Sequence, residues 1–153
     1  MGIFVAERST DFYSDFEHAT KDSTIIEKGG TSGRIRLKAA GNRLHVIIEQ
    51  EPAGGCLIAC FREGLERKIL CPNMRALADV TGFTGSVDWD AIHAIGAMAD
   101  WGEGGDSRVA YVVRNDQFAP LIKVLQVLFA KTHHQSFTNR KDATAWLESR
   151  DPA

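Results

Sequence analysis

This sequence lacks the short motifs that mark the common enzyme classes. It contains no G-x-S-x-G, H-E-x-x-H or C-x-x-C string, so it offers no nucleophile elbow, zinc-protease helix or dithiol motif. Its only cysteines are Cys56, Cys60 and Cys71. Three thiols at these spacings supply neither a disulfide framework nor the four ligands of a structural zinc site. We therefore expect reduced thiols, no metal, no cofactor and no catalytic residues.

The chain also lacks an excess of basic charge and any long hydrophobic run. Its formal net charge is −2 at pH 7 and its basic residues are scattered, which argues against a nucleic-acid binder. The longest apolar run, Phe118 to Ala130, is shorter than the ~20 residues that cross a membrane. Because the N-terminus carries no export signal, we expect a cytoplasmic protein without a membrane span.

What the sequence does contain is a series of apolar segments separated by turn residues. Residues 34–40 and 43–50 alternate apolar and polar side chains around Gly41-Asn42, which predicts a β-hairpin. Further strands are expected at 74–81, 108–113 and 135–138, and helices at 56–68, 86–101, 117–131 and 141–149. Strands that are apolar on both faces indicate a sheet covered by helices. We predict an α/β fold with a mixed, mostly parallel sheet, an N-terminal hairpin and about four helices.

The first residues differ in composition from the rest. Residues 1–32 mix hydroxyl and acidic side chains with a few aromatics, and GGTSG at 29–33 has the composition of a flexible hinge. We predict an N-terminal arm over 1–32, either mobile or docked on the body or a partner, and a single α/β domain over 33–150.

The loop TGFTGS at 81–86 joins a predicted strand to a predicted helix. Such a loop presents free backbone amides to an anion, and Thr84 and Ser86 add hydroxyls. It lacks the lysine of a Walker-type phosphate loop. The alternative is that Thr84 or Ser86 caps the helix, with Asp88 and Asp90 complementing its dipole.

Polar side chains also follow the other strands. Ligands of open α/β sheets gather at the carboxyl ends of the strands. Four residues are therefore candidates for a ligand cleft there: Gln50, Ser86, Arg114 and Asn115. Ordinary solvated loops are the alternative interpretation.

The predicted helix at 117–131 is apolar in nearly every direction, and its stretch 118–130 has Lys123 and Gln126 as its polar residues. Either the rest of the chain covers this helix or part of it contacts a partner or a ligand. We expect self-association through it. The following pair, His133-His134, is interpreted as a cationic helix end.

The order of these elements, with the ending that carries Asp142, Ala145, Trp146 and Leu147, resembles the STAS domain. That fold is shared by sulfate-transporter tails and anti-sigma-factor antagonists, and the resemblance covers about residues 33–150. Regulatory members carry a phosphorylatable serine in a D-S-S-G turn. That turn falls on TGFTGSVD, residues 81–88, where Ser86 is the nearest hydroxyl, or less favourably Thr84, and the D-S-S-G string is absent.

The resemblance implies a non-catalytic, bacterial signalling module that acts through protein contacts. The predicted surface is the 82–90 loop with the following helix, including Thr84, Ser86, Asp88 and Trp89, and phosphorylation of Ser86 would modulate it. The alternative is a small-ligand or lipid-binding protein that uses the polar cleft and the 117–131 helix. A large apolar pocket would favour that alternative.

Overall fold

The computed structural model describes residues 24–71, 73–97, 107–114 and 118–149. This part of the chain forms six strands and four helices, with three strands first and helices and strands alternating after them. In chain order they are β1 (Thr24–Gly30), β2 (Gly33–Ala40), β3 (Arg43–Gln50), α3 (Gly54–Glu66), β4 (Arg75–Phe83), α4 (Trp89–Ala97), β5 (Arg108–Val112), α5 (Ala119–Leu128), β6 (His133–Phe137) and α6 (Arg140–Glu148).

The strands form one sheet whose spatial order follows the chain, from β1 to β6. The first three strands pair antiparallel, and β3 to β6 run parallel to one another. Each parallel step is bridged by one helix, as a parallel connection requires. The predicted α/β class and the mixed, mostly parallel sheet are confirmed.

The predicted hairpin is β2 paired with β3, closed by Ala40 opposite Arg43. Gly41 in the turn has a φ of 62°, a backbone conformation that glycine adopts without steric cost. The turn chemistry in the sequence therefore sets the register of this strand pair.

Part of the segment predicted as an arm belongs to the sheet. Residues Thr24–Gly30 form β1 and pair with β2, so that Gly30 lies opposite Gly33. The GGTSG segment is thus the turn of a hairpin, and its interpretation as a hinge was wrong. Only one side chain of β1, Ile26, is buried among the hydrophobic residues, which left too weak a pattern to predict a strand. Residues 1–23 of the predicted arm lie outside the described residues.

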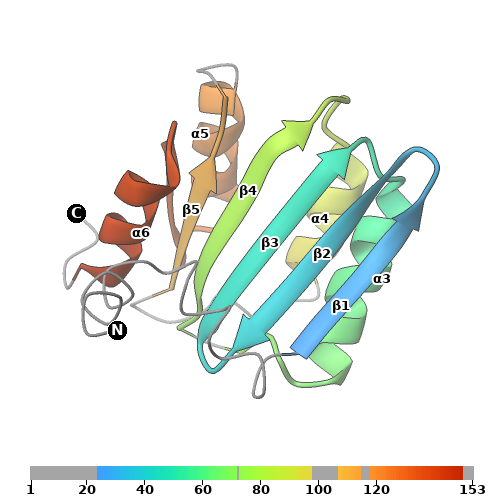
Figure 1. Ribbon diagram of the computed structural model, residues 1–153, viewed down its shortest axis with the longest axis horizontal. Coiled ribbons are helices and arrows are strands. Elements are labelled where there is room, and N and C mark those ends of the chain that lie inside the picture. Colours follow the sequence, from blue (N-terminus) through green and yellow to red (C-terminus); the bar gives the residue numbers. More distant parts are fainter. Residues whose placement is uncertain (1–23, 72, 98–106, 115–117, 150–153) are drawn as a thin grey trace, which may run out of the picture.

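The helices divide between the two faces of the sheet (Figure 1). One face carries α3, α4 and α5, and the largest apolar cluster lies between α3 and the first five strands. The other face carries α6, whose Ala143 and Leu147 pack on Leu77, Ala110 and Val112. We call these the α3–α5 face and the α6 face. Across the described residues, every helix falls short of the length and apolarity needed to cross a membrane.

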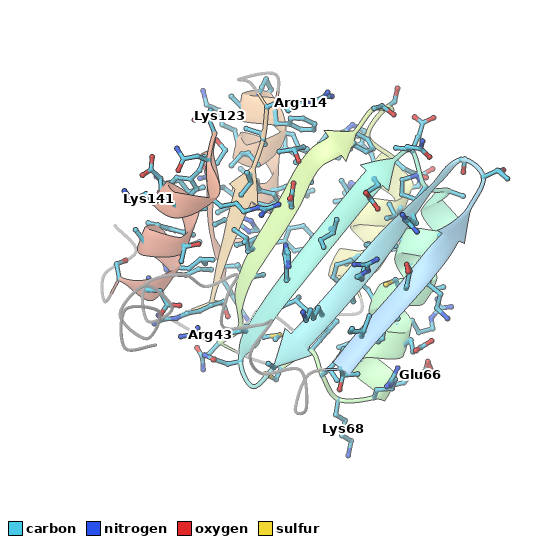
Figure 2. The ribbon with its side chains drawn as sticks, viewed as in Figure 1. Arg43, Glu66, Lys68, Arg114, Lys123 and Lys141 are labelled. Atoms are coloured by element: carbon cyan, nitrogen blue, oxygen red, sulfur yellow. The ribbon has the colours of Figure 1, made fainter. Side chains whose placement is uncertain are left out.

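Arginines at the start of three strands hold the end of α6. Arg108 is fully buried and donates to the carbonyl oxygens of Trp146 and Ser149 at 2.8 and 2.6 Å. Arg75 donates to the carbonyl of Leu147, and Arg43 pairs with the Glu148 carboxylate at 3.1 Å. Figure 2 shows Arg43 at the lower edge of the sheet. Cations suit this position because the C-terminal end of a helix carries partial negative charge.

Candidate functional site

A cavity of about 210 Å³ lies between the sheet and the three helices of the α3–α5 face. The strands contribute Val46, Ala78 and Val109 to its wall, and the helices contribute Phe61, Ile92 and Leu125. Ala76 and Ala78 line it from the centre of the sheet. Because a methyl group fills little of the gap between a strand and a helix, these two alanines leave room where larger residues would close it.

Two polar side chains meet at one end of this cavity. Tyr111 on β5 and His134 on β6 both line it, and the Tyr111 hydroxyl lies 2.9 Å from Nδ1 of His134. The two rings stack with centroids 5.9 Å apart. The Phe129 ring also packs against the His134 ring, with a centroid distance of 6.1 Å. The imidazole is therefore held in place by a hydrogen bond and by aromatic packing.

The electrostatic state of this pair follows from its burial. Burial lowers the pKa of His134 to about 4, so the imidazole is neutral at pH 7. Burial also raises the pKa of the Tyr111 hydroxyl, which stays protonated. His134 is only 6% exposed, and its Nε2 has no partner in hydrogen-bonding geometry among the described residues. The backbone of Phe129 lies near the ring and acts to raise the pKa of His134, against the larger effect of burial.

The opposite end of the cavity lies where the parallel strands end. Phe83, Ser86, Asp88 and Phe118 line it there. Val109 and Val113, which line the cavity along the β5 segment, are separated by about 13 Å at the usual rise of a strand. The cavity therefore extends from the polar loop after β4, past Tyr111, to His134, which lies opposite Val109. Among the described residues that line it, Asp88 carries the only formal charge at pH 7.

The TGFTGS loop binds a group of the chain itself at the position expected for an anion. The Ser86 amide donates to a carboxylate oxygen of Glu51 at 2.6 Å. The Thr84 amide donates to the carbonyl of Gln50 at 3.2 Å. The Ser86 and Thr84 side chains are exposed. An external anion at the Ser86 amide would have to displace Glu51.

The helix after this loop is capped by Asp88. Its Oδ1 accepts from the Ala91 amide at 3.0 Å, and Asp90 lies in the first turn of α4. The expected cap by Thr84 or Ser86 was wrong, because the helix begins at Trp89, three residues later than predicted. Trp89 itself is 40% exposed.

The structure brings only part of the predicted polar cleft to the cavity. Ser86 lines the cavity, whereas Gln50 is exposed and Arg114 donates to the carbonyl of Phe83 at 3.3 Å. Figure 2 shows Arg114 at the same end of the molecule as Lys123. Asn115 lies outside the described residues. The polar loops thus border one end of an apolar site.

The predicted 117–131 helix, which is α5, is neither fully covered nor fully exposed. Ile122 and Leu125 are buried and line the cavity. Val124, Val127 and Leu128 on its other side are exposed. Its excess of apolar residues therefore serves the cavity on one side and leaves an apolar strip on the other.

The two adjacent histidines begin β6, so their interpretation as a cationic helix end was wrong. Successive strand residues point to opposite faces. His133 is consequently exposed, whereas His134 is buried at the cavity. The sequence analysis did not identify His134 or Tyr111 as site residues. The available signal was a side chain with a polar end at a position where the strand pattern predicts a buried apolar residue.

The thiols play no visible part in this site. All three cysteines are free, and burial raises the pKa of Cys60 to about 12. Within the described parts of the chain, no group of three histidine, cysteine or acidic residues is placed to hold a metal ion.

Comparisons of this chain with protein-family models, with curated proteins and with solved structures find no match. The STAS resemblance therefore stays a prediction, and the function has to be argued from the site.

Proposed function

We propose that this protein binds a small apolar molecule in the cavity of the α3–α5 face. The observation that carries the proposal is the cavity itself, about 210 Å³ of apolar space with a buried, hydrogen-bond-competent His134 at one end. An apolar body with few well-placed polar groups is the usual composition of a small-molecule site.

The size of the cavity supports ligand binding over imperfect packing. Protein interiors normally contain few voids larger than a water molecule. An apolar space of this size leaves the side chains that line it without packing partners on one side, which costs free energy. A dry apolar cavity of about 150 Å³ already binds benzene. A ligand that fills this cavity would recover much of that free energy.

The test is to fill the cavity from within. Ala78→Leu adds a larger side chain to the centre of the sheet wall, and Ala145→Leu makes the same change at an exposed position of α6. We expect apolar probes such as benzene derivatives to raise the melting temperature of the wild type and of Ala145→Leu, but not of Ala78→Leu. If none of these probes changed the melting temperature of the wild type, the proposal would be contradicted. An organic extract of the purified protein, read by mass spectrometry, would identify a resident molecule.

A second candidate is a regulatory module that acts through protein contacts at the 82–90 loop. Two exposed side chains of this loop favour this candidate: Ser86, and Trp89, which is 40% exposed. A phosphate on Ser86 would add about −1.5 to −2 charges next to the Glu51 carboxylate and would weaken its hold on the loop. Capture of partners from a cell extract by wild type, Ser86→Asp and Trp89→Ala tests this candidate. An identical set of partners for all three would exclude it.

This second candidate includes a cytoplasmic location and self-association through α5. The exposed strip of Val124, Val127 and Leu128 is the feature that supports self-association. Self-association through this strip would leave the cavity, on the opposite side of α5, accessible to a ligand.

A further inference from the structure

The hydrogen bond between Tyr111 and His134 bears on which nitrogen of the imidazole carries the proton. A neutral imidazole has one donor and one acceptor nitrogen, and the phenol has one proton to donate. If Nδ1 carried the proton and donated to Tyr111, both the phenol proton and the Nε2 lone pair would be left without partners. If Tyr111 donates to Nδ1, only the Nε2–H lacks one. Since buried polar groups are costly to leave unpaired, the tautomer that carries the proton on Nε2 is favoured, and this N–H belongs to a residue that lines the cavity.

The charges around the cavity select a neutral ligand. His134 is uncharged at pH 7, and the one charged side chain among the described lining residues is the carboxylate of Asp88. A buried carboxylate or phosphate on the ligand would therefore find no compensating cation in this lining, and burying an unpaired charge is strongly unfavourable. A neutral oxygen that accepts one hydrogen bond avoids this cost.

The volume limits the size of the ligand. Since a dry cavity of about 150 Å³ accommodates benzene, 210 Å³ suits a molecule of about 8 to 12 non-hydrogen atoms. The aromatic rings of Tyr111, Phe129 and Phe61 in the wall favour a flat or cyclic apolar body.

We propose that the site takes a small neutral ketone, aldehyde, ester or ether with an apolar body, whose oxygen accepts a hydrogen bond from Nε2–H of His134. This inference rests on the proposed function and adds the chemistry of the ligand. Tyr111 is a positioning residue in this account, because its hydroxyl holds the proton of His134 on Nε2.

Two probes of nearly identical shape separate the ligand chemistry from the cavity. Acetophenone carries a carbonyl oxygen where α-methylstyrene carries a methylene group. We expect both to bind the native protein in titration calorimetry, with acetophenone binding about five- to tenfold more tightly because it pairs Nε2–H. Equal binding would overturn this inference and leave the proposed function intact. If neither probe bound, the proposed function itself would fail.

Variants assign the preference to the histidine. Because His134→Phe frees the Tyr111 hydroxyl, the informative variant is the double substitution His134→Phe with Tyr111→Phe, which removes both donors and should bind the two probes equally. His133→Phe changes the exposed neighbour and should keep the preference. A preference that survived the double substitution would contradict the assignment.

Nitrogen NMR of the histidines provides a readout on the native protein that does not depend on the folding of any variant. We expect His134 to be protonated on Nε2, and its Nε2–H resonance to shift with acetophenone but not with α-methylstyrene. A proton on Nδ1 would overturn the inference. Tyr111→Phe removes the bond that holds the tautomer and should reduce the preference for acetophenone.

Discussion

The two faces of the sheet differ in how closely their helices pack on the strands. On the α6 face, Ala143 and Leu147 are fully buried against the strands, and the guanidinium of Arg108 is held by carbonyl groups at the end of the helix. On the α3–α5 face, the helices border a cavity of about 210 Å³, and His134, whose Nε2 lacks a hydrogen bond among the described residues, lies in its wall. The strands are shared, so the difference lies in which side chains they turn to each face.

Polar groups show the same contrast. Asp79 on the α6 face accepts hydrogen bonds from the Thr81 amide and hydroxyl at 3.0 and 2.6 Å and pairs with Arg140. Although burial acts to raise the pKa of Asp79, these hydrogen bonds and the ion pair lower it overall. We infer that the α6 face serves the fold alone, whereas the α3–α5 face holds the largest apolar cluster and also carries the cavity proposed to bind a ligand.

The largest expected effect compares two buried leucines on the two faces. Leu147→Ala removes a fully buried side chain from the packed α6 face, and we expect a loss of about 3–4 kcal/mol in the free energy of unfolding. Leu125→Ala, on the cavity wall, should lose only about 1–2 kcal/mol, since one side of that side chain already lacks neighbours. Denaturant unfolding of both variants without ligand measures the difference. Equal losses would break the comparison.

The next effect concerns the arginines that hold α6. Arg108→Met should cost about 2–3 kcal/mol, because it deprives buried carbonyls of charged donors. Arg43→Ala removes a half-exposed ion pair with Glu148 and should cost less than about 1 kcal/mol. The same unfolding measurements apply. A larger loss for Arg43→Ala would show that burial does not decide the contribution of these cations.

The element pattern was the most predictable part of this molecule. The hairpin at Gly41-Asn42, the later strands and the four described helices lie close to where apolar periodicity and turn residues indicated, although α4 begins three residues later and β6 two residues earlier than predicted. The exception was β1, because an edge strand with one buried apolar side chain leaves no clear alternation. Face assignment was also beyond the sequence, since nothing in the pattern of residues 140–148 tells which side of the sheet receives the helix.

The third prediction compares a buried and an exposed histidine by their effect on the pH dependence of folding stability. The pKa of His134 is lowered to about 4, below the ~6.5 of an unfolded chain. The unfolded state therefore binds the proton more readily, so stability falls as the pH decreases from about 6.5 to 4. His134→Phe should flatten this fall, whereas His133→Phe at the exposed neighbour should leave it unchanged. His45, whose pKa burial also lowers to about 4, keeps part of the slope in both variants. Thermal melting across this pH range is the measurement.

The smallest effect on stability comes from the outer side of α5. Val127 is 78% exposed, so Val127→Asp should change the free energy of unfolding by less than about 0.5 kcal/mol. If the strip mediates self-association, this variant should be monomeric at concentrations where the wild type is not. Light scattering decides the point, and a wild type that stays monomeric at high concentration would remove the self-association proposal.

The site was less predictable than the fold, for physical reasons. Polar loops at the strand ends can be found by position, and Ser86 does border the cavity. The cavity itself arises from the distance between α5 and two alanines far away in the sequence, and no local pattern encodes that distance. His134 could only be recognised once the pairing of β5 with β6 placed it beside Tyr111.

Xenon offers the most direct test of the central claim, because its atoms occupy dry apolar cavities and leave clear density. Crystals of the wild type under xenon pressure should show the gas between Ala78, Leu125 and the Tyr111 ring, with none beneath α6. An α3–α5 face without bound xenon, or xenon distributed equally on both faces, would contradict the account.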